Sequence, residues 1–143
     1  MEDLERYLDE YVEPTIEDFQ KNPTSRRHAF LACVALFHSI DYLAFPRRSR
    51  TIRQQFRSDC ADFALIDRVA HAFKHVIAGN SDQKLTATEV ISRPPAFYGT
   101  AVFDLSRWDD QTGGVTLNSD RDIDLLEAIR GATNFLRNQI VAR

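Results

Sequence analysis

Apolar residues recur at helical spacing over most of the chain. Residues 1–21 predict a first helix, which Pro14 either kinks or divides by beginning a second one. Residues 26–45 are apolar on most sides, a pattern typical of a helix in the middle of a bundle. Residues 62–79 predict a third, amphipathic helix that stops at Gly79. These segments together indicate a mainly helical protein.

Short polar breaks separate these segments. Thr24 or Ser25 is expected to cap the helix at 26–45, and Pro46 ends it. A short arginine-rich helix is predicted next, with apolar residues at four-residue steps to anchor it: Ile52, Phe56 and Cys60.

In the last third of the chain, patterns typical of strands and turns precede the final helix. Residues 84–92 predict a strand, and residues 98–105 alternate in the way that is typical of another strand. The run W-D-D-Q-T-G-G predicts a turn, with a short return strand at 115–117. Residues 119–122 fit a capping box that opens a final helix. The apolar face of that helix contains Ile123, Leu126, Ile129, Thr133, Leu136 and Ile140.

A chain of 143 residues suggests one domain. We therefore expect a mainly α fold over residues 1–143, an up-down bundle of four to five helices. A small β-hairpin is expected before the last helix, as an insertion at about residues 84–117.

Composition limits the functional classes. Apolar residues make up 43% and charged residues 27%, the profile of an ordinary globular protein. The formal net charge of -3 gives no overall attraction to nucleic acid, although it does not exclude a local basic patch. Two cysteines, Cys33 and Cys60, favour a reducing compartment. The acidic start and the lack of a long apolar run predict a cytoplasmic protein without a membrane segment.

Charged residues gather in two places. Residues 2–18 carry eight acids opposed by Arg6, which indicates a solvated face or a docking surface for a basic partner. Five arginines form a basic segment suited to phosphate: Arg47, Arg48, Arg50, Arg53 and Arg57. The alternative is that this basic segment pairs with the acidic first helix.

The helix at 62–79 gathers more titratable side chains on one narrow face than any other segment of the chain. One arc of it, on the side away from its apolar seam, contains Asp67, Arg68, His71, Lys74 and His75. Such an arc can simply face water, but two histidines one turn apart beside Asp67 and Arg68 are more than a solvated face requires. This arc is where we expect a site.

Two stretches resemble the helical HEPN superfamily. The run S-R-R-H-A-F-L-A-C-V-A-L-F-H-S-I-D-Y-L at residues 25–43 is similar to the long first core helix of those domains. Arg68 and His75 fit the superfamily's R-x(4–6)-H motif with six intervening residues. The resemblance covers about residues 24–79 and implies a dimer that cleaves RNA without a metal ion. The run A-F-K-H-V is also similar to a helix in bacterial proteins of unknown function.

These residue types suit RNA cleavage. A neutral His75 or His71 could accept the proton of a ribose 2′-hydroxyl, and Arg68 could stabilise charge on the phosphorus centre. The basic segment could hold the flanking backbone. We hypothesise a metal-independent endoribonuclease that acts at a homodimer groove and needs no cofactor.

Two other classes stay open. His71 and His75 lie one turn apart and could bind a divalent metal. The set could be completed by His38 and Asp41 of the helix at 26–45, or by Asp67. His38 could equally be a core histidine satisfied by a neighbour. The third class is a non-catalytic scaffold or regulatory binding protein, in which the polar arc stabilises a contact between helices.

Overall fold

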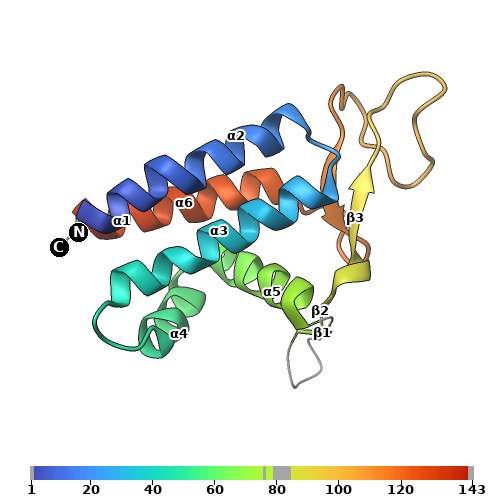
Figure 1. Cartoon of the computed structure of the whole chain (residues 1–143). Coiled ribbons are helices and arrows are strands. Elements are labelled where there is room, and N and C mark those ends of the chain that lie inside the picture. The colour runs from blue at the N-terminus through green and yellow to red at the C-terminus, as the bar shows by residue number, and fades with distance from the viewer. Residues whose placement is uncertain (1, 76, 79–84, 142–143) are drawn as a thin grey trace.

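The computed structural model describes residues 2–75, 77–78 and 85–141 and is mainly helical (Figure 1). Its helices are α1 (Glu2–Tyr7), α2 (Glu13–Lys21), α3 (Arg26–Ala44), α4 (Arg50–Asp59), α5 (Ala61–His75) and α6 (Leu125–Val141), with a π-helical segment η1 (Leu8–Val12) and a 3-10 turn η2 (Ala87–Glu89). Its strands are β1 (Ile77–Ala78), β2 (Leu85–Thr86), β3 (Val90–Arg93) and β4 (Gly114–Leu117). The predicted fold class, a helical bundle with a small hairpin before the last helix, is confirmed.

The first helical run, from α1 through η1 to α2, keeps one direction (Figure 1), and Pro14 lies within it. The π-helical segment η1 lies just before Pro14, which occupies the first turn of α2. Because α1, η1 and α2 form one continuous run, Pro14 omits an N–H donor from the hydrogen-bond ladder, and the π-helical segment falls at that place. Leu4, Leu8 and Val12 are buried along this run, and they attach it to the rest of the bundle.

Helix α3 lies at the centre of the bundle, in contact with α2, α5 and α6. It begins as predicted at Ser25, whose Oγ accepts a hydrogen bond from the backbone N–H of His28 at 3.3 Å. It ends at Ala44, directly before the predicted stop. Ala29, Cys33 and Leu36 are fully buried, because this helix is covered on several sides. Burial raises the pKa of the Cys33 thiol well above its ordinary range.

Helices α4 and α5 form a second layer beside α3. Phe56 anchors α4 as expected: it is 3% exposed, and its ring meets those of Phe63 and Phe135 edge to face. Helix α5 ends at His75, earlier than predicted, and strand β1 follows. The expected stop at Gly79 lies outside the described residues.

The hairpin differs from the prediction in its first strand. Strand β3 pairs antiparallel with β4, Val90 opposite Leu117 and Arg93 opposite Gly114. Residues 98–105 are turns and loop, so the predicted strand there is wrong. Gly99 and Asp104 have positive φ values of 84° and 59°, which extended backbone does not allow. A second small ladder joins β1 to β2.

The last helix also begins later than predicted. Helix α6 starts at Leu125, so the capping box expected at residues 119–122 is wrong. Its cap is Asp124, whose Oδ1 accepts hydrogen bonds from the N–H groups of Leu126 at 3.0 Å and Glu127 at 3.2 Å. Among the described residues, no helix combines the length and apolarity needed to cross a bilayer.

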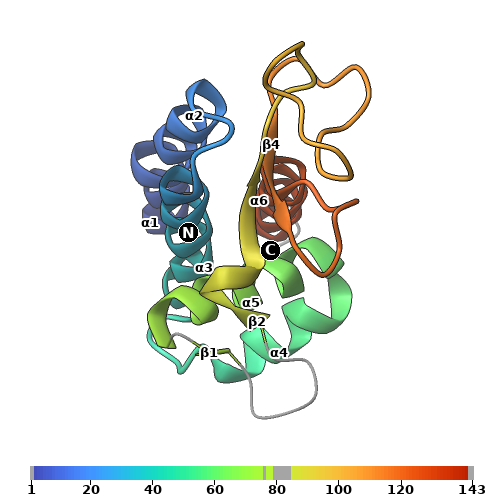
Figure 2. The same ribbon diagram turned by 90° about the vertical axis from the view of Figure 1, so that its right-hand side faces the viewer.

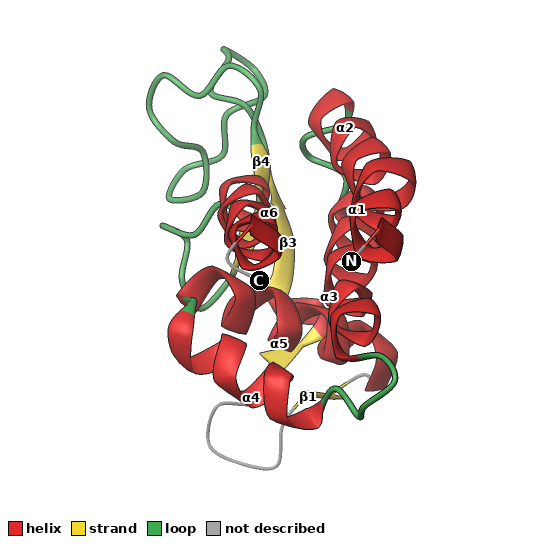
Figure 3. Ribbon diagram, turned by 90° about the vertical axis from the view of Figure 1, so that its left-hand side faces the viewer, coloured by secondary structure: helices red, strands yellow, loops and turns green. Residues whose placement is uncertain are grey.

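A long loop, residues 94–113, connects β3 to β4 and projects from one end of the molecule. Figures 2 and 3 place this loop and α4 at opposite ends. Several of its aromatic side chains are almost fully exposed: Tyr98, Phe103 and Trp108. The loop and the arginine-rich helix are therefore separate surfaces.

Candidate functional site

Asp67 is buried at the contact between α5 and α4, with 1% of its surface exposed. Arg53 Nε lies 3.1 Å from each of its carboxylate oxygens, and Arg53 Nη2 lies 2.9 Å from Oδ1. Arg57 Nε lies 3.3 Å from Oδ2. One buried carboxylate thus holds two arginines of α4 against α5.

This arrangement corrects two expectations. The polar arc of α5 does not lie wholly away from the core, because α4 covers Asp67. The arginines of α4 do not pair with the acidic first helix either. Asp9 and Glu13 of that helix bind Arg137 of α6 instead, at 2.8 Å and 3.0 Å.

His71 is oriented by the same aspartate. Its Nδ1 lies 2.8 Å from the backbone carbonyl oxygen of Asp67 and 3.0 Å from the Oδ1 atom. Both oxygens accept hydrogen bonds, so Nδ1 is the nitrogen that donates, and Nε2 is the nitrogen that these contacts leave free. The edge of Phe37 from α3 packs on the ring at a centroid distance of 4.9 Å. The His71 side chain remains 23% exposed.

The remaining predicted residues of α5 lie beside His71. The rings of His71 and His75 are 6.0 Å apart, and His75 is exposed, as is Lys74. The Nε atom of Arg68 is buried and has no hydrogen-bond partner among the described residues. The Arg68 guanidinium therefore keeps a donor that no described part of the chain satisfies.

The surface around these groups is basic. Arg47 and Arg48 are exposed in the turn before α4, and Arg50 is exposed at its first position. The guanidinium of Arg53 lies 5.4 Å from the centroid of the Phe37 ring. Asp67, with Arg53 and Arg57, leaves one net positive charge before His71 is counted. We define the α4–α5 face by Arg47 and Arg48 in the turn before α4, by Arg50, Arg53 and Arg57 of α4, and by Arg68, His71 and His75 of α5. This set of cationic and imidazole groups suits a phosphate group.

His38 lies on α3, whereas His71 and His75 lie on α5. It is an exposed residue, not a core histidine, and its Nδ1 lies 3.2 Å from Asp41 Oδ2 on the same helix. In the described part of the chain, no three His, Cys, Asp or Glu side chains are grouped closely enough to hold a metal ion. The alternative metal site of His38, His71 and His75 is therefore not assembled there.

Searches against protein-family models, curated proteins and solved structures gave no match. The function of the α4–α5 face has to be inferred from its own chemistry.

A second charged cluster was missed by the sequence patterns. Arg93 is 2% exposed; its Nε lies 3.0 Å from Asp110 Oδ2 and its Nη2 lies 2.7 Å from Asp124 Oδ2. Burial alone would raise the pKa of Asp110, but hydrogen bonds from Arg93, Gly113 and Thr112 outweigh it and lower the pKa. This cluster fixes the base of the 94–113 loop to the start of α6. The signal that could have found this cluster is the pairing of β3 with β4, which sets Arg93 opposite Gly114 and so brings the two ends of the loop together.

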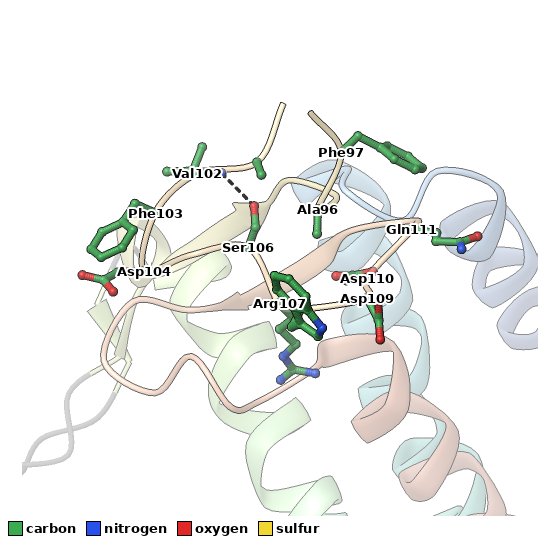
Figure 4. A pocket seen from close by; sticks show the side chains of 12 residues that line it. Ala96, Phe97, Val102, Phe103, Asp104, Ser106, Arg107, Asp109, Asp110 and Gln111 are labelled. Atoms are coloured by element: carbon green, nitrogen blue, oxygen red, sulfur yellow. Dashed lines mark hydrogen bonds between the residues drawn. The ribbon is translucent and has the colours of Figure 1, made fainter. Parts of the chain in front are cut away.

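The 94–113 loop encloses an open hollow of about 750 Å³ (Figure 4). Its lining includes Phe97, Phe103, Ser106 and Arg107. Arg107 donates to the backbone carbonyls of Arg121 and Asp122, so its guanidinium supports the loop. None of the site residues predicted from the sequence lines this hollow.

Proposed function

We propose that the α4–α5 face binds RNA and cleaves it without a metal ion. The single observation that supports this most directly is the contact between Asp67 and His71. An imidazole whose Nδ1–H is held by an acidic partner presents Nε2 as a base, in the way that general base catalysis requires.

The reaction would use the two histidines in turn. His71 Nε2 accepts the proton of a ribose 2′-hydroxyl, and the 2′-oxygen attacks the adjacent phosphorus. The bond from phosphorus to the 5′-oxygen breaks, and His75 in its protonated form supplies a proton to that leaving oxygen. The products are a 2′,3′-cyclic phosphate end and a 5′-hydroxyl end.

Cationic groups around the histidines suit the charge that develops during this step. The Arg68 side chain is partly exposed although its Nε is buried, and its guanidinium could stabilise the negative charge of the transition state. Arg47, Arg48 and Arg50 could bind the flanking phosphates, since guanidinium groups contact phosphate oxygens well.

The proposal includes a homodimer in the cytoplasm, in which two copies of the α4–α5 face share one groove. A symmetric interface repeats each contact, so two copies would double the basic surface available to one RNA strand. Light scattering and crosslinking test this part. A strict monomer that still cleaves RNA would remove the shared groove but leave the chemistry in place.

The test is cleavage of mixed-sequence single-stranded RNA in the presence of EDTA. We expect His71→Ala, His75→Ala and Arg68→Ala each to lower the rate by about 100-fold, the usual contribution of an acid–base or charge-stabilising group. His28→Ala, whose ring contacts Ser25 Oγ at the start of α3, is the histidine control and should keep full activity. An RNA with 2′-deoxy positions at each linkage should resist cleavage. Full activity in all three variants, or no cleavage of varied RNAs by the wild type, would refute the proposal.

The alternative is a non-catalytic RNA-binding or regulatory protein. The burial of Asp67 favours this reading, because a carboxylate shared by Arg53, Arg57 and His71 also holds two helices together without any chemistry. Under this alternative, RNA binds to the wild type with strong salt dependence, and no cyclic phosphate product forms.

A further inference from the structure

A second pocket lies where the start of α1 meets the end of α3. Its volume is about 420 Å³, and the described residues that line it are Asp3, Asp41, Tyr42 and Phe45. Two carboxylates and two aromatic rings form this lining, and no basic side chain is among them. Aromatic faces and carboxylates together attract organic cations.

The aromatic side of the pocket is held in place. Tyr42 stacks on Tyr7 at a centroid distance of 4.2 Å, with 22° between the ring planes. Tyr7 in turn donates a hydrogen bond from its hydroxyl to the Ala35 carbonyl oxygen at 2.9 Å. Tyr42 is 44% exposed and Phe45 is 82% exposed, so both rings keep surface for a ligand. Burial, with Tyr42 and Asp41 close by, raises the pKa of Tyr7.

The two carboxylates remain accessible. Asp3 pairs with Arg6 at 2.6 Å and Asp41 pairs with His38 at 3.2 Å, but their side chains are 73% and 56% exposed. Such surface pairs are weak, so they give way to a better partner. The rest of the first helical run adds exposed acids around this pocket, among them Glu5 and Glu10.

An adjoining pocket extends the same surface. Its volume is about 370 Å³, and it shares Asp3 and Tyr42 with the first pocket. Arg6, Tyr7, Glu10 and Tyr11 complete its described lining. Two connected pockets along an acidic surface fit an extended chain better than a single small ion.

We propose that this surface binds an arginine-containing segment of a partner polypeptide. One guanidinium packs on Tyr42 and Phe45 and donates hydrogen bonds to Asp3 and Asp41. Arginine suits the pocket better than lysine, because its flat guanidinium stacks on aromatic rings and donates in a fork to carboxylates. The adjoining pocket receives the next part of the segment.

The test is fluorescence anisotropy with a labelled hexa-arginine peptide and RNA-free protein. We expect the wild type to bind hexa-arginine more tightly than hexa-lysine. The double variant Asp3→Asn/Asp41→Asn should weaken binding by about tenfold or more, which corresponds to the loss of two charged contacts. Glu17→Gln/Asp18→Asn removes the same charge from α2, away from the pocket, and should change the affinity by about twofold or less. Tyr42→Leu should reduce the preference for arginine over lysine.

Four results would overturn the proposal. The first is no binding of hexa-arginine by the wild type, and the second is equal weakening in the two double variants, which would indicate general charge attraction. The third is that N-acetylarginine amide binds as tightly as the peptide, which would indicate a small-molecule site. The fourth is a wild-type dimer, seen by light scattering without peptide, that Asp3→Asn/Asp41→Asn dissociates; the occupant would then be a second copy of this chain.

Discussion

The Nδ1 atom of His71 lies 2.8 Å from the carbonyl oxygen of Asp67 and 3.0 Å from its carboxylate, one helical turn away. The same carboxylate binds Arg53 of α4. One side chain therefore joins two helices and sets the orientation of an imidazole. A substitution at Asp67 is therefore expected to change both the stability of the fold and the proposed RNA cleavage. Unfolding and cleavage experiments measure the two effects separately.

Asp67→Asn is expected to destabilise the fold by about 2 kcal/mol, because it leaves the Arg53 guanidinium without its buried anion. Urea unfolding followed by circular dichroism measures this difference. Asp41→Asn removes an exposed carboxylate and should cost about 0.5 kcal/mol or less. Equal losses in the two variants would show that burial of Asp67 adds no stability.

The same variant separates binding from cleavage. Asp67→Asn removes a negative charge from the α4–α5 face, so RNA should bind at least as tightly as to the wild type. Cleavage should fall by about tenfold or more, because His71 loses the carboxylate that orients it. Filter binding and a cleavage time course measure the two quantities. Weaker RNA binding in this variant would place the phosphate contacts elsewhere.

RNA affinity should depend on salt through the exposed arginines. Each lost phosphate contact lowers the slope of log affinity against log salt by about 0.7 for a single strand, so Arg47→Ala/Arg48→Ala should lower it by about 1 to 2. Arg27→Ala/Arg130→Ala removes two exposed arginines that lie outside this face and serves as the control. An unchanged slope in Arg47→Ala/Arg48→Ala would exclude these residues from the interface.

The contribution of Asp110 to stability is expected to depend on pH. Its pKa is lowered in the folded protein, so the carboxylate stabilises the fold above its unfolded pKa of about 4 and loses that effect as pH falls through the folded value. The stability difference between the wild type and Asp110→Asn should be constant from about pH 5 to 7 and shrink below about pH 4. Urea midpoints at several pH values measure it. A difference that grows on acidification would contradict the assigned direction.

Two glycines with positive φ, Gly99 and Gly113, allow backbone strain to be compared with and without close contacts. Gly113 has φ +69°, and a Cβ there would meet the Arg93 carbonyl oxygen and the Thr24 methyl group. Gly99 has φ +84° with open space around it. Gly99→Ala should therefore cost about 1 kcal/mol from backbone strain alone, whereas Gly113→Ala should cost about 3 kcal/mol or more. Thermal melting of both variants compares them, and equal melting points would show that the contacts at Gly113 relax freely.

Helix ends and apolar faces were predictable where the signal is local. Ser25 caps α3 and Phe56 anchors α4, since each acts through its own neighbours in sequence or through simple periodicity. The burial of Asp67 was not predictable, because it depends on where α4 packs. That packing is set by the contacts of Phe56 with Phe63 and with the distant Phe135.

Two predictions were wrong because a short sequence pattern was outweighed by another constraint. Residues 98–105 alternate like a strand, yet Gly99 and Asp104 take left-handed backbone conformations that turn the chain. Residues 119–122 match a capping box, yet Asp124 caps α6 because its carboxylate also binds Arg93. In both cases a tertiary contact or a turn outweighed a short sequence pattern.

The 94–113 loop has a fixed base and an exposed tip. Arg93 binds Asp110 across its two ends, and the Ala96 N–H donates to the Asp110 carbonyl oxygen at 2.7 Å. Residues 97–104 are all exposed and add nothing to the helical core. A foreign sequence grafted at the tip would be held between two ends whose positions are fixed by these contacts. Substitutions at the tip would therefore change the surface of the protein and leave its buried core unchanged.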